Sequence, residues 1–321
     1  MRLMSALLVA VTLTGVAAVA AAQSYPTRPV RIIIPFPPGN TMDIMARLIA
    51  PKMTERLGQN FIVDNRAGAS GQLGLELAAR AAPDGYTLVG GQGGNLVVAP
   101  HTYKKIPYDP LKDFAPIAVS TTNYLALVTH PTVPFRSVKD LVAYAKSQPG
   151  KLSVATNGEG GFPHMTIELL RTMAGFQYLH VPYKGSAEIA TQLIGGHVDV
   201  AVDGITGLAP HIRSGKLRLL GVTNPTRVPQ FPDAPAIAES VPGYDSRGWF
   251  GFLAPAGTPR DIVDKLNQEI NRAIALPEVR DKLVAAGLII VGEPPEFFAQ
   301  LIRTEYAKYG KLIRDIGFQP Q

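Results

Sequence analysis

Short apolar runs alternate along the chain with longer segments in which apolar residues recur every three or four positions. The first run, residues 32–34 (III), is β-branched and favours a strand, which the proline- and glycine-rich residues 36–40 (FPPGN) end. Beyond this turn, Met42, Met45 and Ile49 stand at helical spacing. The stretch therefore predicts a strand, a stiff turn and a helix whose first N–H groups face the carboxyl end of the strand and are suited to bind an anion.

The same arrangement recurs through most of the remaining sequence. Strands that alternate with helices indicate an α/β fold with mostly parallel sheets, each covered on both faces. The predicted strands cover residues 61–65, 86–90, 151–157, 178–183, 198–202 and 288–291, and the predicted helices cover residues 75–82, 137–147, 164–174, 187–194, 258–275, 277–286 and 295–316.

The chain is long enough for two lobes of ordinary size. Residues 117–129 hold two apolar β-type runs that are suited to cross from one lobe to the other, and residues 216–223 are suited to return. Two crossings form a hinge with a ligand cleft between the lobes. We predict a discontinuous first domain of residues 23–125 and 226–321, and a second domain of residues 126–225.

The N-terminus has the pattern of an export signal. Arg2 precedes an apolar run over residues 7–19, and three alanines at 20–22 form a small-residue cleavage site. We predict that residues 1–22 are a signal peptide, although the uncharged run is also nearly long enough for a membrane anchor. Export and the absence of cysteine from the sequence favour the bacterial periplasm.

Composition and motifs exclude several classes of protein. The formal net charge of +6 is spread without a lysine or arginine cluster, so nucleic acid is not an expected partner. No two of the six histidines lie within five residues, and the sequence has neither a phosphate-binding loop nor a G-x-S-x-G motif. The G-x-x-G-x-x-G spacing of residues 68–74 differs from the dinucleotide fingerprint and is typical of a tight turn. We predict no catalytic residue, metal or cofactor.

Polar residues gather in five turns that follow predicted strands. Open α/β sheets bind ligands at these ends, and turns that offer N–H groups, hydroxyls and amides suit a carboxylate. The candidate ligand-binding residues are Phe36, Pro38, Gly39, Asn40, Thr41, Asp43, Gln92, Asn95, Thr156, Asn157, Gly158, Phe162, His164, Lys184, Gly185, Ser186 and Asp203.

Several candidates also have an ordinary structural interpretation. Asp43 lies three residues after the good N-cap Asn40, so it is suited to cap its own helix. His164 is suited either to donate to a carboxylate or to cap a helix, and Lys184 either to pair with an acid or to face solvent. The aromatic rings of Phe36 and Phe162 suit the cleft or the core, whereas Trp249 suits the core.

Motifs along nearly the whole mature chain resemble one family, the TctC or Bug (Bordetella uptake gene) receptors of tripartite tricarboxylate transporters. The resemblance rests on residues 25–30 (YPTRPV), 35–39 (PFPPG), 64–69 (DNRAGA), 83–88 (PDGYTL), 108–110 (YDP), 180–185 (HVPYKG), 215–218 (GKLR), 249–251 (WFG) and 254–259 (APAGTP).

The resemblance implies a two-lobed periplasmic-binding fold (type II-like) that closes on a small carboxylate, without catalysis. Family ligands include di- and tricarboxylates, acidic amino acids, nicotinate-type compounds and aromatic acids. The resemblance also implies a monomer that delivers its ligand to a two-component membrane permease. In the family, the turn at Pro38 and Gly39 faces the turns at residues 156–158 and 185–186; Asn40 replaces a usual second glycine.

Two other functions are compatible with the sequence. One is a periplasmic sensor of the same fold that signals to a membrane histidine kinase. The other is a hydrolase that uses Ser70 or Ser186 with a distant histidine, which requires the two side chains to lie within hydrogen-bond reach.

Overall fold

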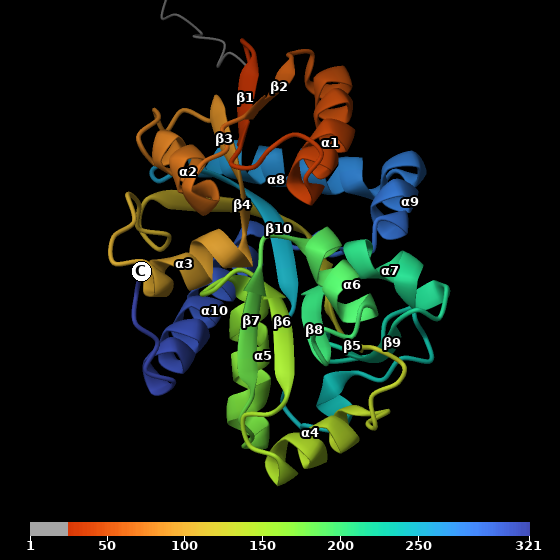
Figure 1. Cartoon of the computed structure of the whole chain (residues 1–321). Helices are drawn as coiled ribbons and strands as arrows, with labels where there is room; N and C mark the ends of the chain where they lie inside the picture. Colours follow the sequence, from red (N-terminus) through yellow and green to blue (C-terminus); the bar gives the residue numbers. More distant parts are fainter. Residues whose placement is uncertain (1–24) are drawn as a thin grey trace, which may run out of the picture.

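The computed structural model describes residues 25–321, so the predicted signal peptide lies outside the described residues. This part of the chain forms two α/β lobes, one above the other in Figure 1. No helix within residues 25–321 is long and apolar enough to cross a membrane.

The first lobe is built on a six-stranded sheet in the order β11-β4-β10-β3-β1-β2. Its core residues alternate between the two faces: Ile32 and Ile34 of β1 pack toward α1, α8 and α9, whereas Ile33 packs toward α2 and α10. The elements are β1 (Val30–Ile34), α1 (Thr41–Leu57), β2 (Phe61–Asn65), α2 (Gln72–Ala79), β3 (Thr87–Gln92), α3 (Ala99–Thr102), β4 (Phe114–Asn123), β10 (Gly248–Pro255), α8 (Arg260–Ala275), α9 (Pro277–Ala285), β11 (Ile289–Ile290) and α10 (Pro295–Asp315).

The second lobe is built on a five-stranded sheet in the order β7-β6-β8-β5-β9. Val200 and Val202 of β8 face the core beneath α4 and α5, and Ala201 faces the core beneath α6 and α7. The elements are β5 (Leu125–Thr129), α4 (Val138–Ser147), β6 (Ser153–Asn157), α5 (Phe162–Ala174), β7 (Leu179–Tyr183), α6 (Ser186–Ile194), β8 (Val200–Gly204), α7 (Ile205–Arg213) and β9 (Arg218–Val222).

Both sheets are mixed rather than mostly parallel as the sequence pattern predicted. β1, β2 and β3 are parallel to one another, as are β6, β7 and β8. The strands next to the lobe crossings differ, since β10 and β4 pair antiparallel and β5 pairs antiparallel with both β8 and β9. A strand that leaves one sheet for another, or returns, runs against its neighbours because it is not part of a β-α-β repeat.

The chain changes sheet at Tyr124, between β4 and β5, and re-enters the first sheet at Gly248, where β10 begins. Residues 218–222, part of the stretch expected to make the return crossing, instead form the edge strand β9. The return is therefore made by residues 223–247. Hydrogen bonds join the two crossings: the Leu125 N–H donates to Thr223 Oγ1 over 2.8 Å, and the Thr223 N–H donates to the Leu125 carbonyl over 3.1 Å.

Two further elements were not predicted from the sequence. All eight residues of β10 are buried, so the strand shows no alternation of polar and apolar positions. The helix α7 contains both Gly207 and Pro210, which disfavour helices. In addition, residues 91–95 do not form a loop: β3 continues to Gln92, and a π-helical turn begins at Gly94.

Candidate functional site

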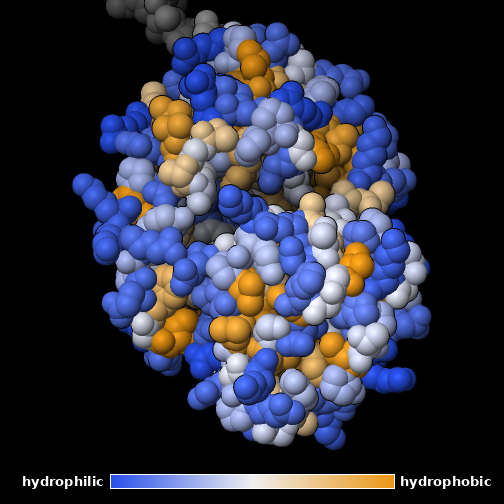
Figure 2. All heavy atoms as spheres, viewed as in Figure 1, coloured by the Kyte–Doolittle hydropathy of each residue, from blue (hydrophilic) through white to orange (hydrophobic). Residues whose placement is uncertain are grey.

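A cavity of about 300 Å³ lies between the two lobes, and we call it the interlobe cavity. The surface in Figure 2 is hollowed between the upper and lower lobes. The lining comes from strand ends and helix starts of both lobes and consists of Asn40, Thr41, Gln92, Gly93, Gly94, Asn123, Leu125, Asn157, Phe162, Pro163, Ser186, Asp203, Gly204, Thr206, Gly207, Gly248, Trp249 and Phe250.

The N-termini of α1, α5, α6 and α7 all contribute to this lining, through Thr41, Phe162, Ser186 and Thr206. Helix α1 belongs to the first lobe and the other three belong to the second. The N-terminus of a helix carries free N–H groups and a partial positive charge. For α5, α6 and α7 no side chain caps these N–H groups. The cavity therefore offers backbone donors to an anion from both lobes.

Asn40 is the N-cap of α1, as predicted, because its Oδ1 accepts from the Met42 N–H over 2.9 Å. Its amide nitrogen makes no hydrogen bond within the described chain, and Asn40 lines the interlobe cavity. Asn40 thus uses its oxygen to hold the helix and presents its N–H groups to the cavity.

Asp43 lies beneath this turn and not in the cavity lining. Its side chain is 4% exposed, and it accepts hydrogen bonds from the Gly39 N–H, Arg47 Nε and Asn65 Nδ2, each over 2.9 Å. Burial pushes the pKa of Asp43 upward, but the hydrogen bonds from Arg47, Gly39 and Asn65 outweigh burial and lower the pKa. Asp43 therefore has a structural role, as expected, but it fixes the turn that precedes α1 through the Gly39 N–H and forms no capping box with the N-cap Asn40.

A second cavity, of about 360 Å³, adjoins the first. Gln92, Gly94, Asn157, Phe162 and Pro163 line both cavities. The predicted residues Phe36, Asn95 and Gly158 line only the second, together with Ser70, Ala99, Thr102, Tyr103 and residues 159–161. The two cavities together form one continuous candidate site along the gap between the lobes.

Asn95 fixes the end of β3 that enters this site. Its Oδ1 accepts from the Gln92 N–H over 3.0 Å, and its carbonyl accepts from the Tyr108 hydroxyl. Its Nδ2 is buried and has no acceptor in the described part of the chain. A buried amide without a partner is costly unless water or a ligand accepts from it.

Asp203 is 4% exposed and is the penultimate residue of β8, two residues before α7 begins at Ile205. Burial raises the pKa of Asp203, while the Ser186 hydroxyl and the Gly204 N–H act in the opposite direction. Within residues 25–321 Asp203 is the single ionisable side chain in the lining of the interlobe cavity. The cavity therefore contains one acid and no lysine, arginine or histidine.

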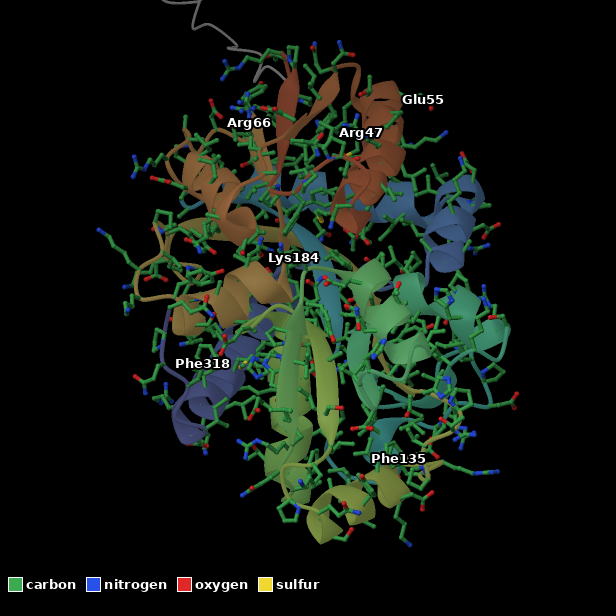
Figure 3. All side chains as sticks on the ribbon, viewed as in Figure 1. Arg47, Glu55, Arg66, Phe135, Lys184 and Phe318 are labelled. Atoms are coloured by element: carbon green, nitrogen blue, oxygen red, sulfur yellow. The ribbon has the colours of Figure 1, made fainter. Side chains whose placement is uncertain are left out.

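Seven predicted residues do not line either cavity: Pro38, Gly39, Asp43, Thr156, His164, Lys184 and Gly185. Pro38 and Gly39 form the exposed tip of the turn before α1, and Gly185 is the N-cap of α6. Lys184 is exposed and directly follows β7, and Figure 3 labels it near the gap between the lobes. Thr156 is buried and pairs with His180 through Oγ1 over 2.7 Å.

Of the two interpretations of His164, the structure supports the structural one. Its Nδ1 accepts from the Gly160 N–H over 3.0 Å, and its ring stacks on His180 with 3.7 Å between centroids. Burial, the neighbouring His180 and Arg171 lower the pKa of His164 to about 3, so the ring is neutral at physiological pH. It lies in a separate pocket with Glu168, Tyr178 and Phe318, and its hydrogen bond from Gly160 ties it to the loop of residues 158–161.

The site includes residues that the sequence pattern did not single out as ligand contacts, chiefly Asn123, Thr206 and Trp249. Asn123 is the last residue of β4. A Cβ atom on Gly248 would lie 2.0 Å from Asn123 Oδ1, so the position of the Asn123 side chain requires a glycine at 248. Trp249 is 2% exposed and packs edge-to-face on Phe298, which agrees with its predicted core role, yet it also closes one side of the cavity. The available signal for Asn123 was the polar run of residues 120–123 at the end of the crossing strand β4.

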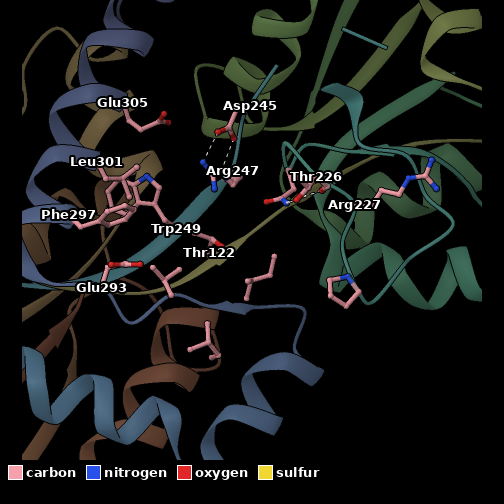
Figure 4. A pocket seen from close by; sticks show the side chains of 15 residues that line it. Thr122, Thr226, Arg227, Asp245, Arg247, Trp249, Glu293, Phe297, Leu301 and Glu305 are labelled. Carbon is pink, nitrogen blue, oxygen red and sulfur yellow. Dashed lines mark hydrogen bonds and ion pairs between the residues drawn. The ribbon is translucent and has the colours of Figure 1, made fainter. Parts of the chain in front are cut away.

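A larger cavity, of about 440 Å³, lies at the hinge, where Trp249 also contributes to its lining (Figure 4). Its charged residues include Arg247 paired with Asp245 over 2.7 Å and Arg227 paired with Glu239 over 2.9 Å. Glu293 and Glu305 add negative charge. Because both arginines are neutralised by acids, this cavity is less suited to an anion than the interlobe cavity.

The geometry required of a serine hydrolase is not met. Ser70 Oγ pairs with the Tyr103 hydroxyl over 3.0 Å, and Ser186 lies beside Asp203. Among the histidine hydrogen bonds of residues 25–321, none involves Ser70 or Ser186. The glycine-rich residues 68–74 serve close packing, since a Cβ on Gly74 would lie 2.7 Å from Pro35 Cβ.

Comparison with known proteins gives consistent matches over nearly the whole chain. The family model described as "Tripartite tricarboxylate transporter family receptor" (TctC) matches residues 45–318. Protein BugT of Bordetella pertussis is 35% identical over 318 residues, which cover 98% of each chain.

Two solved structures from Rhodopseudomonas palustris are also similar. Rpa4515 with adipate has a TM-score of 0.79 and 35% identity, over 92% of this chain and all of the other. MatC (Rpa3494) with bound malate has a TM-score of 0.75 and 32% identity, over 90% of this chain and all of the other. These matches confirm the family resemblance predicted from the motifs, and with it the two-lobed α/β binding-protein fold.

Proposed function

The chain belongs to the tripartite tricarboxylate transporter receptor family, a family of solute-binding proteins and not of enzymes, and we propose that it captures a small carboxylate in the interlobe cavity. It then delivers this ligand to the membrane permease of a tripartite tricarboxylate transporter. We propose that it does so in the periplasm, after removal of residues 1–22.

The observation that carries the proposal is the convergence of four helix N-termini on a cavity without a basic side chain in the described chain. Free N–H groups at helix starts bind carboxylates through hydrogen bonds and the helix dipole. Two similar proteins, whose structures are described with adipate and with malate, support an aliphatic dicarboxylate as the ligand class.

Both lobes take part in the proposed binding. Asn40 and Thr41 come from the first lobe, whereas Asn157, Ser186 and Thr206 come from the second. A ligand that contacts both sets stabilises the closed arrangement in proportion to the contacts it gains there. The hydrogen-bonded crossings at Leu125 and Thr223 are the proposed hinge.

A thermal-shift screen of ligand-free protein from Gln23 onward tests the proposal. The panel contains adipate, malate, citrate, aspartate, nicotinate and terephthalate, with methylammonium as a cationic control. A ligand at one hundred times its Kd stabilises the folded state by about 2.7 kcal/mol, which raises Tm by roughly 4 °C for a chain of this size. An unchanged Tm with every carboxylate of the panel contradicts the proposal.

Two variants test whether the ligand binds in the interlobe cavity. Asn40→Ser keeps an oxygen for the Met42 N–H but removes the amide donors, and Ser186→Ala removes a hydroxyl from the lining. Each loses about one hydrogen bond to the ligand, so Kd rises about 5- to 15-fold. The matched control is Ser214→Ala, an exposed serine beyond the far end of α7, for which Kd stays unchanged. An unchanged Kd in both cavity variants contradicts this location.

A further inference from the structure

The Asp203 carboxylate is the least expected group in a cavity that is proposed to bind carboxylates. It is 4% exposed, its Oδ2 has no hydrogen-bond partner in the described part of the chain, and it lies in the lining beside Ser186. Buried polar atoms are almost always paired, so an unpaired carboxylate oxygen at a cavity wall points to a partner that enters with the ligand or from solvent.

No positive side chain compensates the charge of Asp203. Burial raises the pKa of Asp203, and the Ser186 hydroxyl and the Gly204 N–H act in the opposite direction. No charged residue contributes to the shift. The strands next to β8 carry no charged side chain. The helices packed on β8 carry these titratable groups: His164, Glu168 and Arg171 on α5, Glu188 on α6, and His211 and Arg213 on α7.

These groups are paired elsewhere or, for His211 and Arg213, lie in the last turn of α7, at the end of that helix away from Asp203. Glu168 accepts from Arg171 and Tyr178, and His164 belongs to the same separate pocket. Glu188 accepts from the Lys184 N–H, and the Arg213 guanidinium lies over the Phe231 ring. A ligand carboxylate that enters the cavity therefore meets Asp203 without an intervening cation. Two carboxylates that share a site of low polarity cannot both stay ionised at little cost, so one of them binds a proton.

We propose that Asp203 takes up one proton from solvent when a carboxylate enters the interlobe cavity, and that its protonated oxygen then donates a hydrogen bond to the ligand carboxylate. This inference rests on the proposed function. The ligand keeps its charge and receives the N–H groups of the helix starts, while neutral Asp203 changes from a repulsive neighbour to a donor. Linkage requires the reciprocal effect, namely that a proton on Asp203 strengthens ligand binding.

The alternative is that Asp203 stays ionised and accepts a hydrogen bond from a hydroxyl or ammonium group of the ligand. The two chemistries differ in their dependence on pH and on the ligand. Adipate has no hydroxyl or amino group, so it isolates the carboxyl–carboxylate contact, whereas malate adds a hydroxyl beside one carboxylate.

The experiment is isothermal titration calorimetry of the mature protein with adipate and with malate, from about pH 6.5 to about pH 8.5, where both ligands are dianions. Wild-type Kd for adipate is expected to rise with pH, by up to tenfold per pH unit. At fixed pH, the binding enthalpy in buffers of different ionisation enthalpy is expected to show uptake of up to one proton. The variant Asp203→Asn is neutral at every pH and donates through its amide, so it is expected to bind adipate with no pH dependence and no proton uptake.

Glu55→Gln is the matched control, because it removes one acid from the exposed face of α1, away from the cavity (Figure 3), and is expected to keep the wild-type pH dependence. A pH-independent wild-type Kd without proton uptake overturns the inference and leaves the proposed function intact. Loss of malate binding but not of adipate binding in Asp203→Asn, with a flat wild-type profile, also overturns it and assigns an ionised Asp203. Failure of wild-type protein to bind any carboxylate of the panel even at about pH 5.5 overturns the proposed function itself. If Asp203→Asn does not fold, the buffer dependence of the wild-type enthalpy still decides the question.

Discussion

Replacing Asp43 with asparagine tests whether this buried acid holds the turn that precedes α1. The substitution keeps the shape of the side chain but removes its charge and turns one acceptor into a donor. Asp43 accepts from three donors: the Gly39 N–H, Arg47 Nε and Asn65 Nδ2. Asparagine has one oxygen for these donors, and its amide group faces the remaining ones in a buried site.

The magnitude follows from the hydrogen bonds that are lost. Hydrogen bonds to a charged group contribute about 1.5–3 kcal/mol each, and a buried unsatisfied donor costs about 1–3 kcal/mol. Because the turn is exposed and can relax, we expect a net loss of about 3 kcal/mol in the free energy of unfolding at pH 7. Urea unfolding followed by circular dichroism measures this loss.

The pH dependence gives an independent readout. The pKa of Asp43 is lowered by folding, so its contribution is fully present above the ordinary carboxyl pKa of 3.8 and is lost as the pH falls below that value. The difference in the free energy of unfolding between wild type and Asp43→Asn is therefore expected to be constant from pH 7 to about pH 5 and to become smaller below about pH 4. The control is Asp140→Asn, an exposed residue in the first turn of α4, for which we expect a much smaller loss. A loss in Asp43→Asn below about 0.5 kcal/mol at pH 7 would refute the reasoning.

Two further predictions concern the hinge and the packing of the first lobe. Thr223→Val keeps the shape of a fully buried residue but leaves the Leu125 N–H without its acceptor. We therefore expect the free energy of unfolding in urea to fall by about 1–3 kcal/mol. A loss below about 0.5 kcal/mol would contradict a hinge role for this hydrogen bond. Gly74→Ala places a Cβ 2.7 Å from Pro35 Cβ and 2.9 Å from Pro35 Cα. We expect the free energy of unfolding to fall by about 1–3 kcal/mol in the same assay. An unchanged urea midpoint would show that α2 shifts away from β1 without cost.

Local patterns were sufficient for most elements of the fold. Residues 61–65 form β2 with the predicted bounds, and the helix predicted at residues 137–147 begins at its cap Ser137, whose Oγ accepts from the Asp140 N–H. In both cases the apolar period and the terminating residues agree, so no tertiary information is needed. The strand β10 was missed because its eight residues are all buried and show neither a period of 2 nor one of 3.6.

The assignment of β9 shows a different limit. Residues 218–222 have an apolar pattern that fits a crossing strand as well as an edge strand. The choice depends on pairing with β5, which lies almost a hundred residues earlier in the sequence. Sequence pattern gives the propensity of a strand but not its partner, and mixed sheets arise where a crossing strand pairs with a β-α-β unit.

The candidate site was predictable where it depends on chain position and not where it depends on side-chain direction. Asn40, Asn157 and Ser186 follow strands, and the topology brings strand ends together. His164 and Lys184 occupy equally suitable positions in the sequence, yet His164 turns toward His180 and Lys184 toward solvent. Asn123 and Trp249 enter the lining from the crossing strands β4 and β10, whose place between the lobes the local pattern does not reveal.

The absence of basic side chains from the described lining has a consequence for how the receptor responds to its ligand. A lysine on one lobe would hold a carboxylate strongly whether or not the lobes had closed, because its charge acts without the other lobe. Helix N-termini act only over the first turn, so their donors reach the ligand only at close range. Since α1 belongs to one lobe and α5, α6 and α7 belong to the other, a carboxylate gains its full set of donors only when both lobes contact it. At the proposed site, distributed backbone donors would thus make the affinity for a carboxylate depend on closure. That dependence is the differential affinity that a ligand needs to shift a two-lobed receptor toward its closed state.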